Sequence, residues 1–357
     1  MKSSKCIICK KKTKRFLINF PVFEHQHFST TSFRTDLFKC LSCQMIFRIK
    51  KMNYNFFKNK SYINENNEHK LLSLNDKIKT RSEILAQIVN KKIKKKNNLN
   101  ILEVGCGKGY LLKELSKLKK NSNLYGHDIG NYSKFKIFLN KNISFLKKKI
   151  SFKDNSLDLI VVSHTLNYFS DPLNEIKKYK QYLKKNGFLL ILIPDIKKNL
   201  FYTLMSDQKT IISKVSLRNL LVWSGFSNSF IQNKSLPREL ICFSKPSSKN
   251  IFSIKKKDKT LEKNLKKLKT IKQKILKIKS NNICISGTNV NSAFVDQILR
   301  GKAKNFVSDF YNKNKFFRGK KVIGRKNLHK DKVLINCIKK NNIFLNNKTK
   351  AKIINIL

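Results

Sequence analysis

The chain has 357 residues, 40% of them hydrophobic, and its formal net charge is +57. This length and apolar content are enough for two or three domains with their own cores and exclude wholesale disorder. There is no run of about 18 uncharged apolar residues and no apolar leader, so the sequence predicts neither a membrane span nor a signal peptide. We therefore expect a cytoplasmic, reducing compartment, where paired cysteines indicate a metal site rather than disulfides.

The excess of positive charge has two interpretations. Lysine and arginine neutralise phosphates, which favours a nucleic-acid partner. However, only nine of the 78 basic residues are Arg, the side chain best suited to bidentate phosphate contacts. Lysine, asparagine and isoleucine are abundant throughout, as an AT-rich coding genome would produce. We therefore predict non-specific attraction to polyanions and no specific nucleic-acid partner.

Residues 1–50 contain two Cys-x2-Cys pairs, formed by Cys6, Cys9, Cys40 and Cys43. Each pair places two thiolates on one tight turn, and two such turns complete a tetrahedral zinc site. Four protein ligands leave no open position, so the zinc would be structural and would supply folding energy to a small module. The segment between the pairs suits a small β-ribbon, so we predict a zinc-ribbon-like module. His25 and His27 are less favoured ligands.

Residues 51–98 form a connector, with an aromatic, Asn-rich part at 54–62 and an amphipathic helix at about 76–96. A buried strand is then expected at residues 99–104. It leads into Gly105-Cys106-Gly107-Lys108-Gly109 and a helix from Tyr110. Strand, glycine turn and helix are the first half of a nucleotide-binding unit, because glycines allow close backbone approach and the helix N-terminus offers free N–H groups.

A second strand ends at His127-Asp128, where an acidic side chain can accept hydrogen bonds from ribose hydroxyls. Further α/β units follow, and the last two strands are expected to form an antiparallel hairpin. The remaining strands are predicted just before Lys147 and at 157–163, 187–193, 227–232 and 238–243, with helices at 172–185 and 216–224. Residues 99–245 are therefore predicted to form an α/β, Rossmann-like domain with a seven-stranded sheet.

This ordered set of motifs resembles the class I S-adenosylmethionine-dependent methyltransferases over residues 75–245. An acidic residue precedes the GxGxG turn, and residues 154–160 and 185–188 are similar to the family's entries into its fourth and fifth strands. A dehydrogenase turn could match the glycines alone, but not the ordered set. The resemblance implies that the loop holds the methionine part of the cofactor and Asp128 its ribose. The implied cofactor-binding residues are Glu103, Gly105, Cys106, Gly107, Gly109, Asp128 and Ile129.

The whole layout resembles a narrower group, the sugar C-methyltransferases that carry a zinc module. Residues 246–357 contain an amphipathic helix at 261–278, followed by a second strand–glycine–helix unit at 283–300 and a strand ending at Asp309. Gly319 begins a loop that resembles one in that group's C-terminal domain. The resemblance implies a small C-terminal α/β domain that helps to hold a nucleotide-linked sugar. A lid or interaction domain without a ligand is the alternative.

Three positions depart from the family pattern. Lysines at 147–149 stand where an acidic residue usually meets the adenine, Asn167-Tyr168 replaces a frequent Glu-His, and Gln208 occupies the place of a histidine base. Methyl transfer to a hydroxyl or an acidic carbon needs a group that removes a proton, and glutamine cannot do so.

His164, at the end of the fourth predicted strand, is therefore the catalytic candidate, since strand ends line the ligand crevice. A packed or solvent-facing histidine is the alternative. Tyr168 and Tyr202 are weaker candidates, and Asp195 and Asp207 could orient a sugar hydroxyl.

We predict an enzyme that transfers a methyl group from S-adenosylmethionine to a small polar acceptor, a sugar or nucleotide-linked sugar. An RNA methyltransferase is the second reading, although the N-terminal module lacks an aromatic and arginine stacking platform. A catalytically degenerate methyltransferase scaffold is the third, motivated by Asn167, Tyr168 and Gln208.

Overall fold

The computed structural model describes residues 4–24, 28–49, 70–72, 78–94, 97–130, 132–147, 150–247, 257–308, 315–324, 327–328, 332–337 and 352–357. The chain forms two compact units and passes between them several times. Unit 1 consists of Met1–Arg15, Phe38–Asn199 and Gln208–Asp258, and unit 2 of Phe16–Leu37, Leu200–Asp207 and Lys259–Leu357. Domain boundaries after residues 50, 98 and 245 stay predictions. Within the described residues, no helix combines the length and the apolar character needed to cross a membrane.

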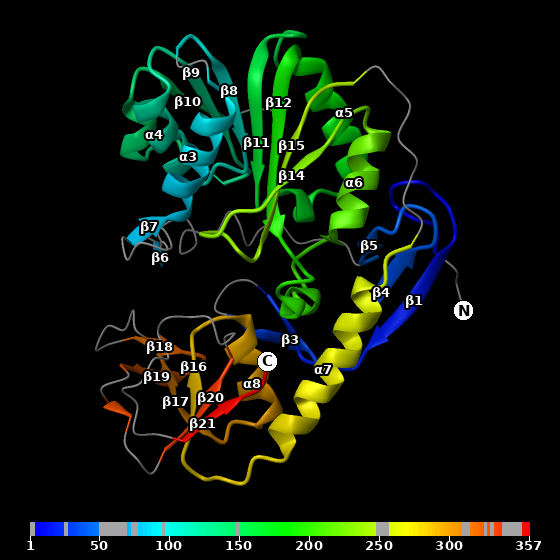
Figure 1. The fold of residues 1–357 in the computed structure, drawn as a ribbon, viewed down its shortest axis with the longest axis vertical. Coiled ribbons are helices and arrows are strands. Elements are labelled where there is room, and N and C mark those ends of the chain that lie inside the picture. Colours follow the sequence, from blue (N-terminus) through cyan, green and yellow to red (C-terminus); the bar gives the residue numbers. More distant parts are fainter. Residues whose placement is uncertain are drawn as a thin grey trace. The chain divides into compact units, whose positions relative to one another are not determined.

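A seven-stranded sheet forms the centre of unit 1, in the order β10-β9-β8-β11-β12-β15-β14 (Figure 1). The first five strands of that order are parallel, and β15 is antiparallel to both of its neighbours. This confirms the predicted seven-stranded, Rossmann-like fold. The strands are β8 (Asn100–Val104), β9 (Asn123–His127), β10 (Ile143–Leu146), β11 (Leu157–Ser163), β12 (Leu183–Pro194), β14 (Ser229–Ile231) and β15 (Glu239–Ser244).

Four helices cover the sheet, two on each face. They are α3 (Arg81–Lys92), α4 (Tyr110–Leu118), α5 (Pro172–Tyr182) and α6 (Lys214–Trp223). Strand residues alternate between the faces, so that Ile101 packs in a cluster with α3 and α4, whereas Leu102 packs in a cluster with α5 and α6. This alternation follows from the two-residue period of a strand.

The first helix begins later than the predicted residue 76. Thr80 caps it, because the Thr80 hydroxyl accepts from the Glu83 N–H at 3.2 Å and the Glu83 carboxylate accepts from the Thr80 N–H at 2.6 Å. A short hairpin of β6 (Lys70–Leu72) and β7 (Ile78–Thr80) precedes it. The cap therefore fixes the start of α3 at Arg81.

The cysteine-containing segment forms a four-stranded sheet in the order β1-β4-β5-β13. Its last strand comes from far along the chain, since Thr210 pairs with Phe47 and Ile211 with Ile46. β2 and β3 form a separate pair. The strands are β1 (Thr13–Ile18), β2 (Val22–Phe23), β3 (Thr30–Ser32), β4 (Thr35–Cys40), β5 (Ile46–Phe47) and β13 (Thr210–Ile211). The described residues also include three short 3-10 helices, η1 (Lys136–Leu139), η2 (Leu166–Tyr168) and η3 (Leu200–Leu204).

The cysteine segment and the seven-stranded sheet share one hydrophobic core. The cluster that includes α5 and α6 also contains buried side chains from both ends of the cysteine segment, namely Cys6, Ile8, Phe38, Cys40, Cys43, Met45 and Phe47. Asn219 of α6 adds a polar contact, donating from Nδ2 to the Cys43 carbonyl at 3.1 Å. These contacts all lie within unit 1.

Unit 2 contains a second α/β sheet, in the order β18-β19-β17-β16-β20-β21. Its strands are parallel except for β18, which is antiparallel to β19. This confirms an α/β arrangement at the C-terminal end. The elements are α7 (Thr260–Leu276), β16 (Ile283–Ser286), α8 (Val290–Ile298), β17 (Ala303–Val307), β18 (Phe316–Phe317), β19 (Lys320–Ile323), β20 (Val333–Asn336) and β21 (Lys352–Asn355).

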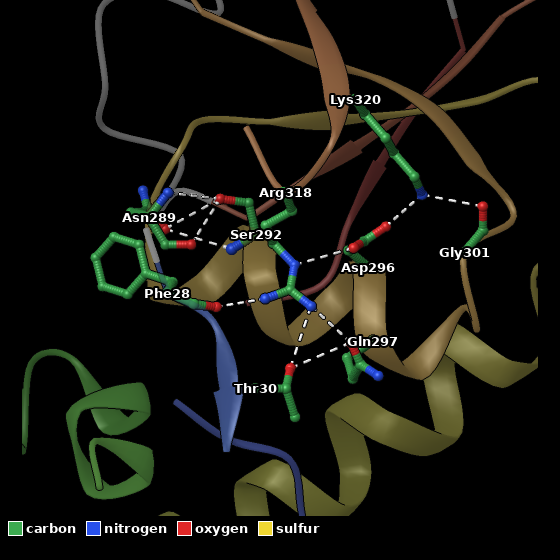
Figure 2. Close-up of polar contacts among 9 residues, drawn as sticks. All are labelled: Phe28, Thr30, Asn289, Ser292, Asp296, Gln297, Gly301, Arg318 and Lys320. Carbon is green, nitrogen blue, oxygen red and sulfur yellow. Dashed lines mark hydrogen bonds and ion pairs between the residues drawn. The ribbon is translucent and has the colours of Figure 1, made fainter. Parts of the chain in front are cut away.

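Arg318, between β18 and β19, ties an N-terminal segment to this sheet within unit 2 (Figure 2). Its guanidinium donates to the Asp296 carboxylate at 3.1 Å, to the Thr30 hydroxyl at 3.1 Å and to the Gln297 carbonyl at 2.6 Å. It also donates to the carbonyl of Phe28. Because residues 28–30 come from the N-terminal part, this one side chain explains how that part contributes to the C-terminal unit.

Candidate active site

The glycine loop between β8 and α4 requires glycine at three positions. Gly105, Gly107 and Gly109 have φ angles of +73°, +50° and +76°, a region that other residues rarely adopt. A Cβ atom on Gly105 would lie 2.0 Å from the hydroxyl oxygen of Thr165, which follows β11. The absence of a side chain at Gly105 therefore lets the ends of β8 and β11 approach closely.

The ends of β8 and β9 are joined by hydrogen bonds of the same loop. The N–H groups of Gly105 and Cys106 donate to the His127 carbonyl at 2.7 and 3.1 Å. The two oxygens of the Asp128 carboxylate accept from the Gly107 N–H at 2.9 Å and from the Gly130 N–H at 2.8 Å. Burial raises the pKa of Asp128 above its ordinary value, although these N–H groups partly offset the effect.

The other predicted cofactor residues lie at the same edge of the sheet. Glu103 and Cys106 are buried, whereas Ile129 is 49% exposed. Burial also raises the pKa of the Cys106 thiol well above its ordinary value, which indicates a packed side chain rather than a reactive thiolate. The loop thus brings the sequence-predicted set together, and the individual roles stay predictions.

His164 lies at the carboxyl end of β11, next to Thr165. Its backbone is held in the left-handed region, with φ of +53°, and its N–H donates to the Leu192 carbonyl at 2.8 Å. Its Nε2 atom is 3.4 Å from Oε2 of Glu239, the first residue of β15. The other oxygen of Glu239 is 3.5 Å from Nη2 of Arg81, the first residue of α3.

Glu239 is a carboxylate at neutral pH. Burial acts to raise its pKa, but His164, Arg81 and Arg238 outweigh burial and lower the pKa below its ordinary value. The sequence analysis missed Glu239 and Arg81. Their only signal is positional, because each begins an element whose neighbours end at the ligand-binding edge of the sheet.

Two of the departures from the family pattern contact each other. The Asn167 amide donates to the Gln208 carbonyl oxygen at 3.4 Å and to the Thr210 carbonyl at 3.1 Å. Both amide side chains are buried. Since neither amide can take up a proton, this pair is neutral across the working range of pH.

The remaining polar candidates have structural contacts of their own. The Asp195 carboxylate accepts from the Lys197 N–H at 2.9 Å and caps the turn after β12. Tyr168 is half-buried in η2 of unit 1, whereas Tyr202 and Asp207 belong to unit 2. Lys147 is exposed. The described residues do not include His25, His27, residues 54–62, residues 148–149 or Asp309.

The four paired cysteines converge. Their sulfur atoms all lie within 4.8 Å of one another, with Cys6 and Cys43 3.6 Å apart and Cys9 and Cys40 3.3 Å apart. A tetrahedral zinc with bonds of about 2.3 Å requires sulfur atoms roughly 3.8 Å apart. Hydrogen bonding from the thiol of Cys43, followed by that of Cys6, lowers the pKa of Cys40, and the same hydrogen bonds raise the pKa values of Cys6 and Cys43. The donor set fits zinc.

The two cysteine turns repeat the same local geometry. In the first, the Ile8 N–H donates to the Cys6 sulfur at 3.3 Å, and in the second the Ser42 N–H donates to the Cys40 sulfur at 3.3 Å. The residue after each second cysteine is left-handed, with φ of +59° at Lys10 and +64° at Gln44. Matched N–H···S bonds orient the first sulfur of each pair and stabilise thiolate charge there.

Part of this chain is similar to known methyltransferases. A family model described as a methyltransferase domain matches residues 77–228. A tRNA (guanine-N(7)-)-methyltransferase of Mycoplasma capricolum subsp. capricolum is 28% identical over 184 residues, which cover 44% of this chain and 81% of that protein.

Two solved structures are similar to somewhat less than half of the chain. A SAM dependent methyltransferase from Aquifex aeolicus is 22% identical with a TM-score of 0.38, covering 45% of this chain and 89% of its own. A putative S-adenosylmethionine dependent methyltransferase from Listeria monocytogenes is 14% identical with a TM-score of 0.39, covering 47% and 99%.

The family match coincides with the strand order and with the glycine loop. It begins just before α3 and ends beyond α6, so that β8 to β12 all lie inside it. The chain therefore carries a class I S-adenosylmethionine-dependent methyltransferase domain, and the protein is a SAM-dependent methyltransferase.

Proposed function

We propose that this methyltransferase modifies a hydroxyl or an acidic carbon of a small polar acceptor, a sugar or nucleotide-linked sugar, with His164 as the base. The observation that carries the proposal is the place of His164 at the carboxyl end of β11. The next residue, Thr165, packs directly against Gly105 of the cofactor loop. An imidazole at this position can remove a proton from an acceptor aligned with the methyl group.

The cofactor residues follow from the loop geometry. The backbone of Gly105 and Gly107 would face the methionine part, Glu103 would contact its polar end, and Asp128 would accept hydrogen bonds from the ribose. When bound, S-adenosylmethionine supplies the activated methyl group on its sulfonium. The protein's part is to align the acceptor, exclude water and remove the proton.

The neutral Asn167–Gln208 pair supports His164 as the base. Both amides are buried and hydrogen-bonded to each other after β11, and an amide cannot take a proton from an acceptor. The His164 side chain has an exposed part that an acceptor can reach, since 26% of it is accessible. Proton removal therefore falls to His164 in this proposal.

We assign the four cysteines a structural zinc. Four thiolates satisfy a tetrahedral ion completely, so the metal would take no part in the reaction and would hold the turns that carry β4 and β5.

An RNA acceptor is the second candidate. The relative from Mycoplasma capricolum is named for the methylation of tRNA, and the net charge of +57 favours contact with any polyanion. The charge alone does not select RNA, because it would also attract nucleotide-linked sugars.

The test is transfer of a tritium-labelled methyl group from the cofactor to two sets of acceptors, nucleotide-linked sugars and unmodified tRNA. We expect label in the sugar fraction, with His164→Gln lowering kcat by about 100-fold or more while cofactor affinity by calorimetry is kept. Label in tRNA alone would replace the sugar proposal with the RNA one. Tight cofactor binding without transfer to either set would favour a degenerate enzyme.

A further inference from the structure

We propose that Glu239, held by Arg81, is a positioning residue for His164 and stabilises the positive charge that the imidazole acquires during methyl transfer. This inference rests on the proposed role of His164 as the base. Three elements meet at the cluster: β11 contributes His164, β15 contributes Glu239 and α3 contributes Arg81.

His164 and Glu239 differ in exposure, and this difference indicates different roles. The Glu239 side chain is 9% exposed, and the His164 side chain is 26% exposed. The imidazole can therefore meet an acceptor, whereas the carboxylate behind it cannot. A group that reaches the reaction only through another side chain orients that side chain and balances its charge.

The contact also distinguishes the two ring nitrogens. Nε2 faces the Glu239 carboxylate at 3.4 Å, which leaves Nδ1 to take the proton from the acceptor. With the cofactor bound, the acceptor's O–H or C–H bond would break and its proton would move to Nδ1, while an electron pair of the acceptor atom would form the bond to the methyl carbon. The bond between the methyl carbon and the cofactor sulfur would break at the same time, and its electron pair would stay on sulfur, leaving a neutral thioether. The resulting imidazolium lies beside a carboxylate, so its formation is favoured.

Arg81 keeps this carboxylate charged despite its burial. It approaches the oxygen of Glu239 that His164 does not contact, at 3.5 Å, and Arg238 is the other cation that lowers the pKa of Glu239. The capped N-terminus of α3 fixes the Arg81 backbone, because Thr80 and Glu83 close the capping box at that point.

The experiment uses the full-length protein with Glu239→Gln, which preserves shape and removes charge, alongside His164→Gln and the double variant. Glu114→Gln is the control, because this substitution removes the same charge at a different place. Glu114 lies on α4 and pairs with Lys117 at 2.8 Å. With the nucleotide-linked sugar panel, we expect Glu239→Gln to lower kcat by about 10- to 100-fold without changing cofactor affinity. The double variant should be no slower than His164→Gln alone, since the two residues act as one unit.

Two readouts separate positioning from mere structural support. The kcat of Glu239→Gln should fall while its KM for the nucleotide-linked sugar stays unchanged, because the carboxylate acts through the base and does not contact the acceptor. Nitrogen-15 spectra of histidine-labelled protein need no acceptor, and in Glu239→Gln they should show a changed environment of the His164 ring, whose signals are identified with His164→Gln.

The outcomes also separate this inference from the proposed function. If His164→Gln keeps full kcat, the proposed function fails. If His164→Gln is slow but Glu239→Gln matches the Glu114→Gln control in kcat and in the spectra, His164 stands and the role of Glu239 is overturned.

Discussion

Gly105 lies where the backbone conformation and the neighbouring side chain both exclude a larger residue. Its φ is +73°, and an added Cβ would lie 2.0 Å from the Thr165 hydroxyl. Gly105→Ala is expected to lower the free energy of unfolding by about 1–3 kcal/mol and to weaken cofactor binding, because the loop must shift. Chemical denaturation and calorimetry would measure both effects.

Gly301→Ala is the matched control for that substitution. Gly301 has φ of +82°, but an added Cβ would have no atom within 4 Å. We expect it to lose only the backbone contribution, about 1 kcal/mol, and to bind the cofactor normally. Equal losses of cofactor affinity in the two variants would contradict the role of close approach at Gly105.

Asp128 makes a pH-dependent prediction for cofactor binding. Only the ionised carboxylate accepts hydrogen bonds at both oxygens, and burial raises the pKa of Asp128 above 3.8. Affinity should therefore decline as the pH falls through that raised value, at a higher pH than for an ordinary aspartate. Asp128→Asn should bind about 10- to 100-fold more weakly at neutral pH and show no such decline. Parallel declines in calorimetric titrations of both proteins would assign the effect to another group.

The residues of the cofactor loop could be predicted because they are contiguous in the sequence. An acidic residue, three spaced glycines and an aspartate after the next strand are local patterns, and parallel pairing of β8 with β9 brings them together. The cluster of Arg81, His164 and Glu239 has no such pattern. Only the antiparallel pairing of β15 with β12, opposite Pro194, brings Glu239 to this edge.

At the scale of elements, the paired cysteine turns should depend on a metal ion. Cys9→Ser is expected to reduce bound zinc well below one ion per chain and to cost about 3 kcal/mol or more of unfolding free energy. Metal analysis and thermal denaturation measure the two quantities. Cys242→Ser is the control, since Cys242 is a buried thiol of β15 whose pKa burial raises to about 11. Zinc content that is unchanged in Cys9→Ser would contradict the four-cysteine site.

The pairing of β5 with β13 should carry the effect of metal loss into the methyltransferase domain. The Arg48 N–H donates to the Lys209 carbonyl at 3.0 Å, and Thr210 in turn holds the Asn167 amide. Chelation of zinc is therefore expected to raise deuterium uptake at residues 208–212 and 166–168. Helix α8 of unit 2 serves as the reference. Uptake confined to residues 4–49 would show that the two elements are not coupled.

Element types were predictable where periodicity is strong, and boundaries were less so. Residues 183–185 were expected to be helical but belong to β12, which extends from Leu183 because Leu157 pairs with it. Ile78 was expected in a helix, but it lies in β7 and the Thr80 cap begins the helix afterwards. The ends of these helices and strands depend on caps and on strand partners, which the spacing of apolar residues does not reveal.

At the scale of the whole molecule, the net charge of +57 predicts salt-sensitive binding of polyanions without selection among them. Affinities for tRNA and for an unrelated RNA of equal length should be similar and should fall together by about 100-fold or more between low and moderate salt. Filter binding over a salt series measures this. A preference for tRNA that persists at high salt would instead indicate a specific site.

The division into two units could not be read from the sequence. Residues 16–37 separate the two cysteine pairs but belong to unit 2, where Phe23 contacts Met205 through a bridge and Arg318 binds the Phe28 carbonyl. Composition changes little along the chain, and no Pro/Gly-rich linker marks a crossing. Long-range packing alone determines which segments assemble together.

The shared core limits how the chain can be shortened. A fragment that begins at residue 77 would keep every position matched by the methyltransferase family. It would nevertheless lose seven apolar side chains of the central cluster, from Cys6 to Phe47. The fragment would also leave β13 without its partner strand β5. This open edge contains the buried Ile211 and is followed by the buried Ile212. Such an edge invites self-association. We therefore expect a stable fragment to begin at the first cysteine turn and not at the boundary of the family match.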